Sequence, residues 1–227
     1  MTNKEFIAKA KTIVNCNTAY GKGTFGQKWT KSLASQKAKQ YPDFYTASVV
    51  ASLNKKAEAG TLFCFDCVGL IKGIIWEWEK VKYKSNGLDD VSDQGLWDKY
   101  CKDKSKDFAN IQPGEIMHIK GHVGIYIGDG KVIECTNKWS KNVLVSSINK
   151  GDKYYRAWTE HGKFTLLTYE GLVAAPSQEG NFHIIKKGET LSSIAKKYNM
   201  TWLKLWRLNP HIINPNLIYP GQKLKIK

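Results

Sequence analysis

Two cysteines three residues apart begin a segment whose residue types could carry covalent chemistry. Cys64 and Cys67 precede the apolar run Val68-Gly-Leu-Ile, which predicts a buried helix. Asp66, directly before Cys67, is a preferred N-terminal capping residue. The unpaired N–H groups and the helix dipole would lower the pKa of the Cys67 thiol and supply oxyanion donors. Cys67 is therefore predicted to be a nucleophile, and Gly69 allows another backbone to approach it closely.

The Cys-x-x-Cys spacing also fits half of a zinc site, a redox pair or two buried small side chains. A zinc site needs a second pair of ligands, whereas Cys101 and Cys135 stand alone in the sequence. A redox motif normally follows a strand of a βαβ unit, and no parallel-sheet pattern is present. We therefore expect no metal and no cofactor. An odd number of cysteines, 5, fits reduced thiols better than a disulfide framework.

A thiol nucleophile needs a neighbouring base, for which histidine is the usual choice. His122 begins the run His-Val-Gly-Ile-Tyr-Ile-Gly, so a rigid strand would hold its ring. His118 ends the preceding strand and is the second choice. His161 lies in Glu-His-Gly-Lys, which predicts a turn, and His183 and His211 lie near the C-terminus. His122 is therefore the predicted base.

The residue that orients His122 depends on the hairpin turn at Asp129-Gly130. A two-residue turn pairs His122 with Asn137, whereas an odd-length loop pairs it with Glu134, because a shift of one residue changes the face. Either side chain could accept the imidazole N–H, but only Glu134 adds a charge that stabilises imidazolium. The residues alone leave both possibilities open.

The elements that must position these groups read as helices followed by strands. Helices are expected at 3–15, about 28–40, 43–59 and from Cys67 through Trp76. Strands are expected at 115–119, 122–127, 131–136, 143–147, 154–158 and 165–169. A helical half followed by an antiparallel half predicts an α+β domain.

Small and polar residues replace the apolar pattern at 170–181, which predicts a linker between domains at 1–169 and 182–227. The formal net charge of +15 favours a polyanionic partner. Because lysine far outnumbers arginine, an anionic wall polymer fits better than a nucleic acid, and we expect no nucleic-acid partner. The sequence start lacks the apolar core of a signal peptide, and no stretch could span a bilayer. We therefore expect synthesis in the cytoplasm and no membrane insertion.

The motifs Asp66-Cys-Val-Gly-Leu-Ile, Gly121-His-Val-Gly-Ile-Tyr-Ile-Gly-Asp-Gly and Val132-Ile-Glu occur in this order. They resemble the NlpC-type papain-like cell-wall hydrolases, and in particular the catalytic domains of phage endolysins. The resemblance covers roughly residues 3 to 168, with Val68 in place of the common serine. It implies a papain-like fold with an antiparallel sheet.

The resemblance also implies the site. Cys67 would be the nucleophile, and His122 the base. The family's third polar residue lies about twelve positions beyond the histidine, which selects Glu134, and a tyrosine near the N-terminus corresponds to Tyr20. The implied activity is hydrolysis of the peptidoglycan stem peptide without a metal. The alternatives are N-acetylmuramoyl-L-alanine amidase cleavage by the same site, or a non-catalytic wall-binding protein. A phage protein of this kind would reach the bacterial wall after release from the host cytoplasm.

Residues 182–227 read as strand, helix, helix and strand, with Thr190 and Thr201 as helix caps. The patterns Gly-Glu-Thr-Leu-x-x-Ile-Ala, Leu-x-x-Leu-Asn and Leu-x-x-Gly-Gln-x-Leu resemble the LysM module, whose members bind N-acetylglucosamine-containing glycans. The resemblance implies a shallow groove for bacterial peptidoglycan. Its predicted lining is Gly188, Glu189, Thr190, Leu191, Asn209, Pro210 and Ile213.

Overall fold

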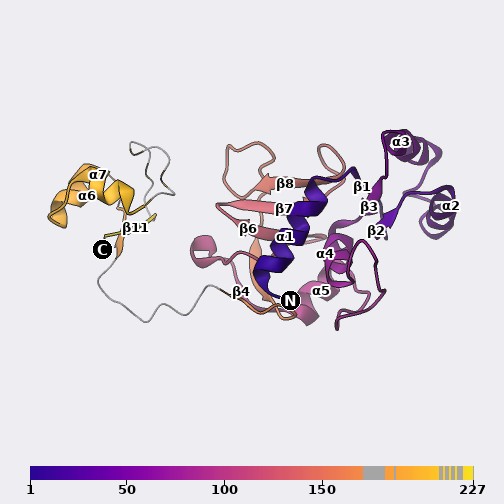
Figure 1. Ribbon diagram of the computed structural model, residues 1–227, viewed down its shortest axis with the longest axis horizontal. Helices are drawn as coiled ribbons and strands as arrows, with labels where there is room; N and C mark the ends of the chain where they lie inside the picture. Colours follow the sequence, from indigo (N-terminus) through magenta and orange to yellow (C-terminus); the bar gives the residue numbers. More distant parts are fainter. Residues whose placement is uncertain are drawn as a thin grey trace. The chain divides into compact units, whose positions relative to one another are not determined.

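A computed structural model describes residues 1–170, 182–186, 188–209, 212, 215, 218 and 222–226 of the 227-residue chain. The chain falls into two compact units, Met1–Gly171 and Leu172–Lys227 (Figure 1). Apart from Glu170, the predicted linker lies outside the described residues. Among the residues described, no helix is both long and apolar enough to cross a membrane.

A six-stranded sheet, in which every neighbouring pair is antiparallel, forms the centre of the first unit. Its order is β4-β9-β5-β6-β7-β8. The strands are β4 (Cys101–Ser105), β5 (Ile116–Ile119), β6 (His122–Gly128), β7 (Lys131–Cys135), β8 (Val143–Ser147) and β9 (Glu160–Phe164). With the helices described next, this sheet gives the unit the expected mixed α and β character.

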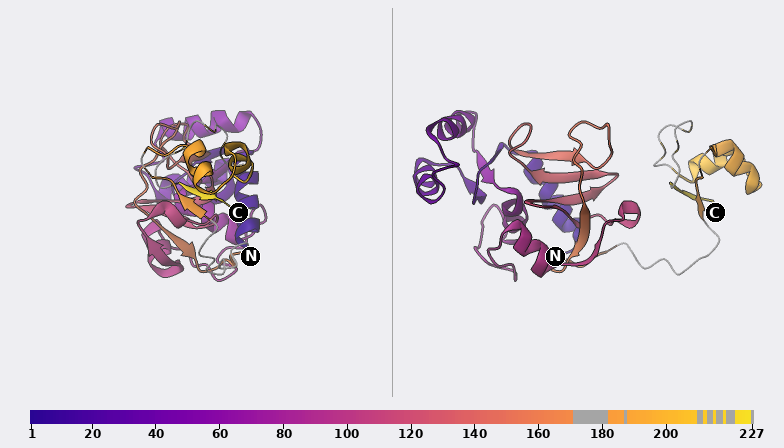
Figure 2. Two further views of the ribbon diagram at one scale, coloured as in Figure 1. Left: turned by 90° about the vertical axis from the view of Figure 1, so that its left-hand side faces the viewer. Right: turned by 180° about the vertical axis from the view of Figure 1, so that it is seen from behind.

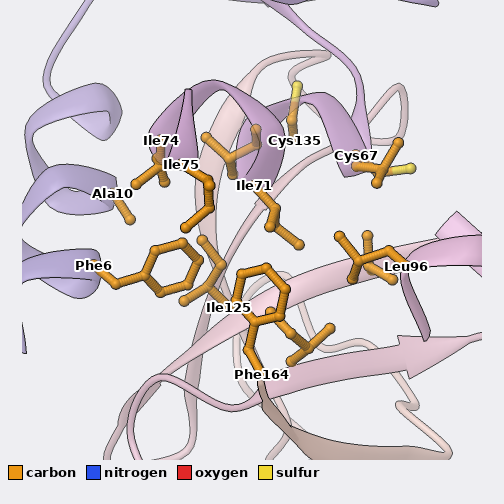
Figure 3. Packing of buried hydrophobic residues seen from close by; sticks show 14 of the residues in the cluster. Phe6, Ala10, Cys67, Ile71, Ile74, Ile75, Leu96, Ile125, Cys135 and Phe164 are labelled. Atoms are coloured by element: carbon orange, nitrogen blue, oxygen red, sulfur yellow. The ribbon is translucent and has the colours of Figure 1, made fainter. Parts of the chain in front are cut away.

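Two helices, α1 (Asn3–Val14) and α4 (Cys67–Ile75), pack on one face of this sheet (Figure 1). Every residue of α4 is buried, as its largely apolar composition predicts, and the one charged residue, Lys72, pairs with Asp90. In Figure 3, Ile74 and Ile75 lie near α1, whereas Cys67 lies at the other end of the helix, on the side of Leu96. The core therefore holds α4 rigidly and leaves its first residue at the edge. Leu96 belongs to α5 (Asp93–Tyr100).

The opposite face of the sheet carries a smaller apolar cluster of Met117, Tyr126, Val132 and Trp158. In the rear view of Figure 2, the strands lie in front of α1. The short helix η1 (Phe108–Asn110) contributes Phe108 to this cluster. Apolar side chains therefore cover both faces of the sheet.

A second, three-stranded sheet lies between the large sheet and the helices α2 (Lys31–Gln40) and α3 (Ala47–Glu58) (Figure 1). Its order is β1-β3-β2, from β1 (Thr18–Tyr20), β3 (Phe63–Phe65) and β2 (Phe25–Lys28). Strands β1 and β3 run parallel. The sequence shows no parallel-sheet pattern, so this parallel pair was not predicted. These strands are too short to show a period in the sequence.

Two expected strands were placed wrongly. The segment 154–158 forms no strand, although Tyr155 makes one isolated bridge to Ser147. The segment 165–169 is mostly turn, and the strand lies just before it, at β9. Both segments are rich in residues that favour strands, but tertiary contacts override this local preference. Helices α2 and α3 begin later than expected, at the caps Thr30 and Thr46.

Gly69 holds the start of α4 against the loop between β1 and β2. A Cβ atom at this position would lie 1.9 Å from the Thr24 carbonyl oxygen. The same oxygen accepts a hydrogen bond from the Asp66 N–H at 2.9 Å. The predicted close approach of another backbone to Gly69 is confirmed, and it fixes Cys67 relative to the loop that follows Tyr20.

We expect Gly69→Ala to lower the free energy of unfolding by about 3 kcal/mol or more, because the added methyl group must displace backbone. Chemical unfolding followed by hydrogen exchange of peptides from α4 measures the effect. Gly95→Ala is the matched control, since its Cβ would meet only side chains, the nearest at 3.1 Å. Equal stability of the two variants would contradict the role given to Gly69.

The second unit consists of β10 (Phe182–Ile184), α6 (Leu191–Lys197), α7 (Trp202–Arg207) and β11 (Lys223–Lys225). Strands β10 and β11 pair antiparallel. The predicted order of strand, helix, helix and strand is confirmed. Thr190 and Thr201 cap the two helices as expected, by accepting hydrogen bonds from the Ser193 and Lys204 N–H groups.

Candidate functional site

Cys67 is the first residue of α4, and Asp66 is its N-cap. The Asp66 carboxylate accepts hydrogen bonds from the Gly69 N–H at 2.5 Å and from the Gly23 N–H at 2.8 Å. The second bond reaches across to the loop after β1. Asp66 therefore both begins the helix and ties it to the segment that carries Tyr20.

The Cys67 sulfur accepts hydrogen bonds from the backbone N–H groups of Val68 and Val123. Burial nevertheless raises the pKa of this thiol to about 12, and the negative charges of Asp66 and Asp93 add to the increase. The prediction that the helix end lowers this pKa was wrong, because it neglected the loss of solvation. The thiol is neutral near pH 7, so it needs a base to become a nucleophile.

His122 is the first residue of β6, directly before the Val123 N–H group that binds the Cys67 sulfur. Its Nε2 atom lies 2.6 Å from Oε2 of Glu134. Its ring stacks on Trp158, with 5.6 Å between ring centroids and 22° between ring planes. The start of β6 therefore holds a histidine of fixed orientation one residue before the N–H group that contacts Cys67.

The hairpin between β6 and β7 puts His122 and Glu134 on one face of the sheet. The two-residue turn pairs Gly128 with Lys131, but the register then shifts, so that Tyr126 pairs with Val132. This β-bulge gives neither of the two registers considered from the sequence. It places Glu134 diagonally across from His122 and leaves Asn137 exposed, beyond the end of β7.

Arg156 also binds Glu134, and this contact was not predicted from the sequence. Its Nε atom donates to Oε1 of Glu134 at 3.0 Å, its Nη2 atom lies 2.6 Å from Oε2, and Nη2 also donates to Thr136 at 3.0 Å. It also lies over the rings of Trp139 and Trp158. The chain contains many lysines but few arginines, and an arginine near two tryptophans was the available signal.

Glu134 is completely buried yet ionised. Burial by itself raises the pKa of a carboxyl group, but the hydrogen bonds from His122 and Arg156 outweigh burial and lower the pKa of Glu134 below its ordinary value. Glu134 can therefore fix the imidazole and stabilise its protonated form. Arg156 shares the same carboxylate and keeps it charged.

The other histidines of the first unit serve the core. His118 is buried, pairs with Glu160 at 2.8 Å and stacks on Trp97. His161 lies in β9, not in the expected turn, and it contacts Glu115 and the Asp107 carbonyl. The polar sequence around it conceals a strand that pairs with neighbours on both sides.

The remaining cysteines offer no second reactive pair. Cys64, in β3, is buried, and burial raises its pKa to about 12. Cys135 donates to the Phe65 carbonyl at 3.1 Å. All five cysteines are free thiols. These contacts give Cys64 and Cys135 the role of small buried side chains.

Tyr20 ends β1 and lines the same cavity as Cys67, a cavity of about 610 Å³. Burial raises the pKa of its hydroxyl far above the ordinary value, and negative charge on Cys67 adds to the increase. Among the described residues, the hydroxyl has no hydrogen-bond partner. Tyr20 therefore presents a protonated hydroxyl in the cavity that Cys67 lines.

The second unit has a cavity of about 240 Å³ at the start of α6. Of the residues predicted to bind substrate, Glu189, Thr190 and Leu191 line it. Gly188 precedes them with a φ of 88°, a backbone conformation that favours glycine. The sequence missed Trp202, which also lines the cavity and is 44% exposed.

Asn209 does not line this cavity. It is buried, and its side chain bonds to the Leu205 carbonyl and to both backbone groups of Lys225. In this position Asn209 joins α7 to β11, and its predicted contact with sugar stays a prediction. The predicted binding residues Pro210 and Ile213 lie outside the described residues.

Comparison with known proteins places the second unit in a family. The LysM domain family matches residues 183–227. The endolysin of Bacillus phage B103 is 52% identical over 46 residues, which are 20% of this chain and 18% of that protein. The N-acetylmuramoyl-L-alanine amidase sle1 of Staphylococcus epidermidis strain RP62A is 45% identical over 53 residues, 23% of this chain and 16% of that protein.

A spore coat assembly protein, ExsA of Bacillus cereus, is 48% identical over 44 residues, 19% of this chain and 7% of that protein. In each case the match spans less than a fifth of the relative's own length. The likeness to the endolysin and the amidase is confined to their LysM regions. Residues 183–227 are a LysM domain.

Proposed function

We propose that the first unit is a cysteine hydrolase of peptidoglycan with a papain-like site, and that the LysM domain directs it to the wall. One observation carries this proposal: the sulfur of Cys67, at the start of a buried helix, meets the start of β6, where Glu134 holds His122. The motif resemblance to NlpC-type hydrolases supports the same assignment. Relatives named endolysin and amidase share the targeting domain.

The reaction follows from the protonation states of these groups. His122 removes the proton from the neutral Cys67 thiol as the sulfur attacks an amide carbonyl. The backbone N–H of Cys67 and the Tyr20 hydroxyl donate to the oxyanion. His122 then gives the proton to the leaving amine, which breaks the C–N bond and leaves a thioester. Water, deprotonated by His122, hydrolyses the thioester and restores the thiol.

Glu134 supports both proton transfers because its charge stabilises the imidazolium form of His122. It is a positioning residue, since it acts through His122. Arg156 in turn positions Glu134. No step needs a metal or a cofactor. After release from the cell that makes it, the enzyme would act on the bacterial wall as an endolysin.

The bond that is cut lies in the stem peptide, or alternatively between N-acetylmuramic acid and L-alanine. Mass spectrometry of purified peptidoglycan digested by the full chain distinguishes them through the new termini. A free amine on L-alanine would identify the amidase, and a new terminus within the stem would identify an endopeptidase. Absence of fragments, with wall binding intact, would leave a wall-binding protein and overturn the catalytic proposal.

We propose that the cavity at Trp202 is the glycan site of the LysM domain. The wall of this cavity combines an exposed indole with hydroxyl groups of Thr190 and Ser192. An aromatic face packs on the apolar face of a sugar ring, while the hydroxyl groups bind its polar edge. Lysines of the same unit would add attraction to anionic wall polymers.

We expect Trp202→Ala to weaken binding of the full chain to purified cell walls about tenfold or more, because the aromatic contact with the sugar ring is lost. A wall-sedimentation assay measures the binding. Leu203→Ala is the matched control, since Leu203 is 37% exposed on the same helix but does not line the cavity. Equal loss in both variants would indicate damage to α7 instead of a lost sugar contact.

A further inference from the structure

The cavity beside Cys67 is lined by an equal number of cationic and anionic side chains. These are Lys22, Lys37, Lys72, Asp66, Asp90 and Asp93. A charged group that lines a cavity is free to bind a ligand only if the protein does not already neutralise it. The partners of each side chain therefore decide what the cavity can recognise.

Most of these charges are already satisfied. Asp66 accepts two backbone N–H groups, and Lys72 pairs with Asp90 at 2.5 Å. Lys37 donates to the Gly23 carbonyl at 2.6 Å and to Gln40 at 2.9 Å. The exposed Lys22 lies over the Tyr41 ring. The paired side chains therefore need no charge from a substrate to neutralise them.

Asp93 is different. Among the described residues it has no hydrogen-bond or ion-pair partner, and its side chain is half-buried. It lies close enough to the nucleophile that its charge raises the pKa of both Cys67 and Tyr20. As the first residue of α5 it also stabilises the helix dipole, but that role requires no position on the cavity wall.

We propose that Asp93 is a specificity-determining residue that binds a free ammonium group of the stem peptide next to the scissile bond. This inference rests on the proposed hydrolase function. A carboxylate beside a thiol nucleophile hinders thiolate formation, so its presence is costly unless it binds a cationic substrate. Two amines fit: the side-chain amine of the diamino acid, or the α-amine at the start of a stem freed from its sugar.

The test compares kcat/KM of the full chain and of Asp93→Asn on four substrates. These are muropeptides with lysine as the diamino acid and sugar-free stem peptides, each with the lysine side-chain amine free or acetylated. We expect Asp93→Asn to lower kcat/KM about tenfold only where the recognised amine is free. If acetylation of the lysine side chain abolishes the loss of kcat/KM, the side-chain amine is the group recognised. If the loss of kcat/KM occurs only with the two sugar-free peptides, the α-amine is the group recognised.

Asp98→Asn is the matched control, because Asp98 is exposed on the same helix and does not line the cavity; it should change nothing. An equal loss on every substrate, or no loss on any, would overturn the role of Asp93. Failure of the proposed function is separate: wild type would then cleave none of the four, as Cys67→Ala does.

Discussion

Cys67→Ala is expected to lower peptidoglycan hydrolysis at least about a thousandfold, because the residue that forms the thioester is removed. Release of soluble fragments from purified walls, followed over time, measures the loss. Cys64→Ala is the matched control, since Cys64 is a buried thiol three residues earlier that does not line the cavity. Similar activity of Cys67→Ala and wild type would remove Cys67 from the mechanism.

The raised pKa of Cys67 gives the same residue a second signature. A neutral thiol gains reactivity in proportion to hydroxide until the pH reaches its pKa, which burial places at about 12. Alkylation of Cys67 by iodoacetamide should therefore be slow at pH 7 and still rise about tenfold per pH unit between pH 7 and 9. Peptide mass spectrometry separates Cys67 from the less buried Cys16.

A rate that levels off below pH 8 would mean that Cys67 and His122 form a thiolate–imidazolium pair in the free enzyme. Such a result would change the first step of the mechanism but not its participants. General-base catalysis on a neutral thiol and a preformed ion pair differ in where the proton lies before attack. The alkylation profile distinguishes them without any substrate.

The sequence predicted the elements that carry Cys67 and His122 because local rules decide them. A largely apolar run after Asp66 is sufficient for a capped, buried helix, and the run after His122 is sufficient for a strand. The LysM domain was predicted throughout its described helices and strands, since both of its helices have threonine caps. In each case the signal lies within about ten residues.

The features that were missed depend on contacts between distant segments. Arg156 lies in a segment predicted to be a strand, and its contact with Glu134 joins residues that are 22 positions apart. The bulge that decides between Glu134 and Asn137 depends on how β6 and β7 pack on the core. The pKa of Cys67 depends on burial by the whole unit, which no cap or dipole rule includes.

Glu134→Gln is expected to lower the free energy of unfolding of the first unit by about 3 to 5 kcal/mol, because Arg156 is left as a buried charge without its counter-ion. The side chain of Arg156 is only 11% exposed, and that of Glu134 is 0% exposed. Activity should also fall, though less than in Cys67→Ala, since His122 keeps a hydrogen-bond acceptor. Asn137→Ala, at the exposed alternative position, should change neither quantity.

The pH dependence has a defined sign. The folded protein holds the pKa of Glu134 below its ordinary value of 4.5, so this ion pair stabilises the fold above that pH and loses its effect as the pH falls further. The difference in stability between wild type and Glu134→Gln should therefore shrink as the medium becomes acidic. Chemical unfolding at pH 7 and pH 3, followed by hydrogen exchange of β6 and β7 peptides, measures it.

A double-mutant cycle with Arg156→Met separates the ion pair from the catalytic role of Glu134. If the loss of stability comes from an unpaired charge, the double variant should recover much of the stability lost in either single variant, because neither charge then remains. Its activity should stay low, since His122 still lacks a carboxylate. Additive losses of stability would show that Arg156 and Glu134 act independently, and recovery of activity would show that His122 does not need the charge.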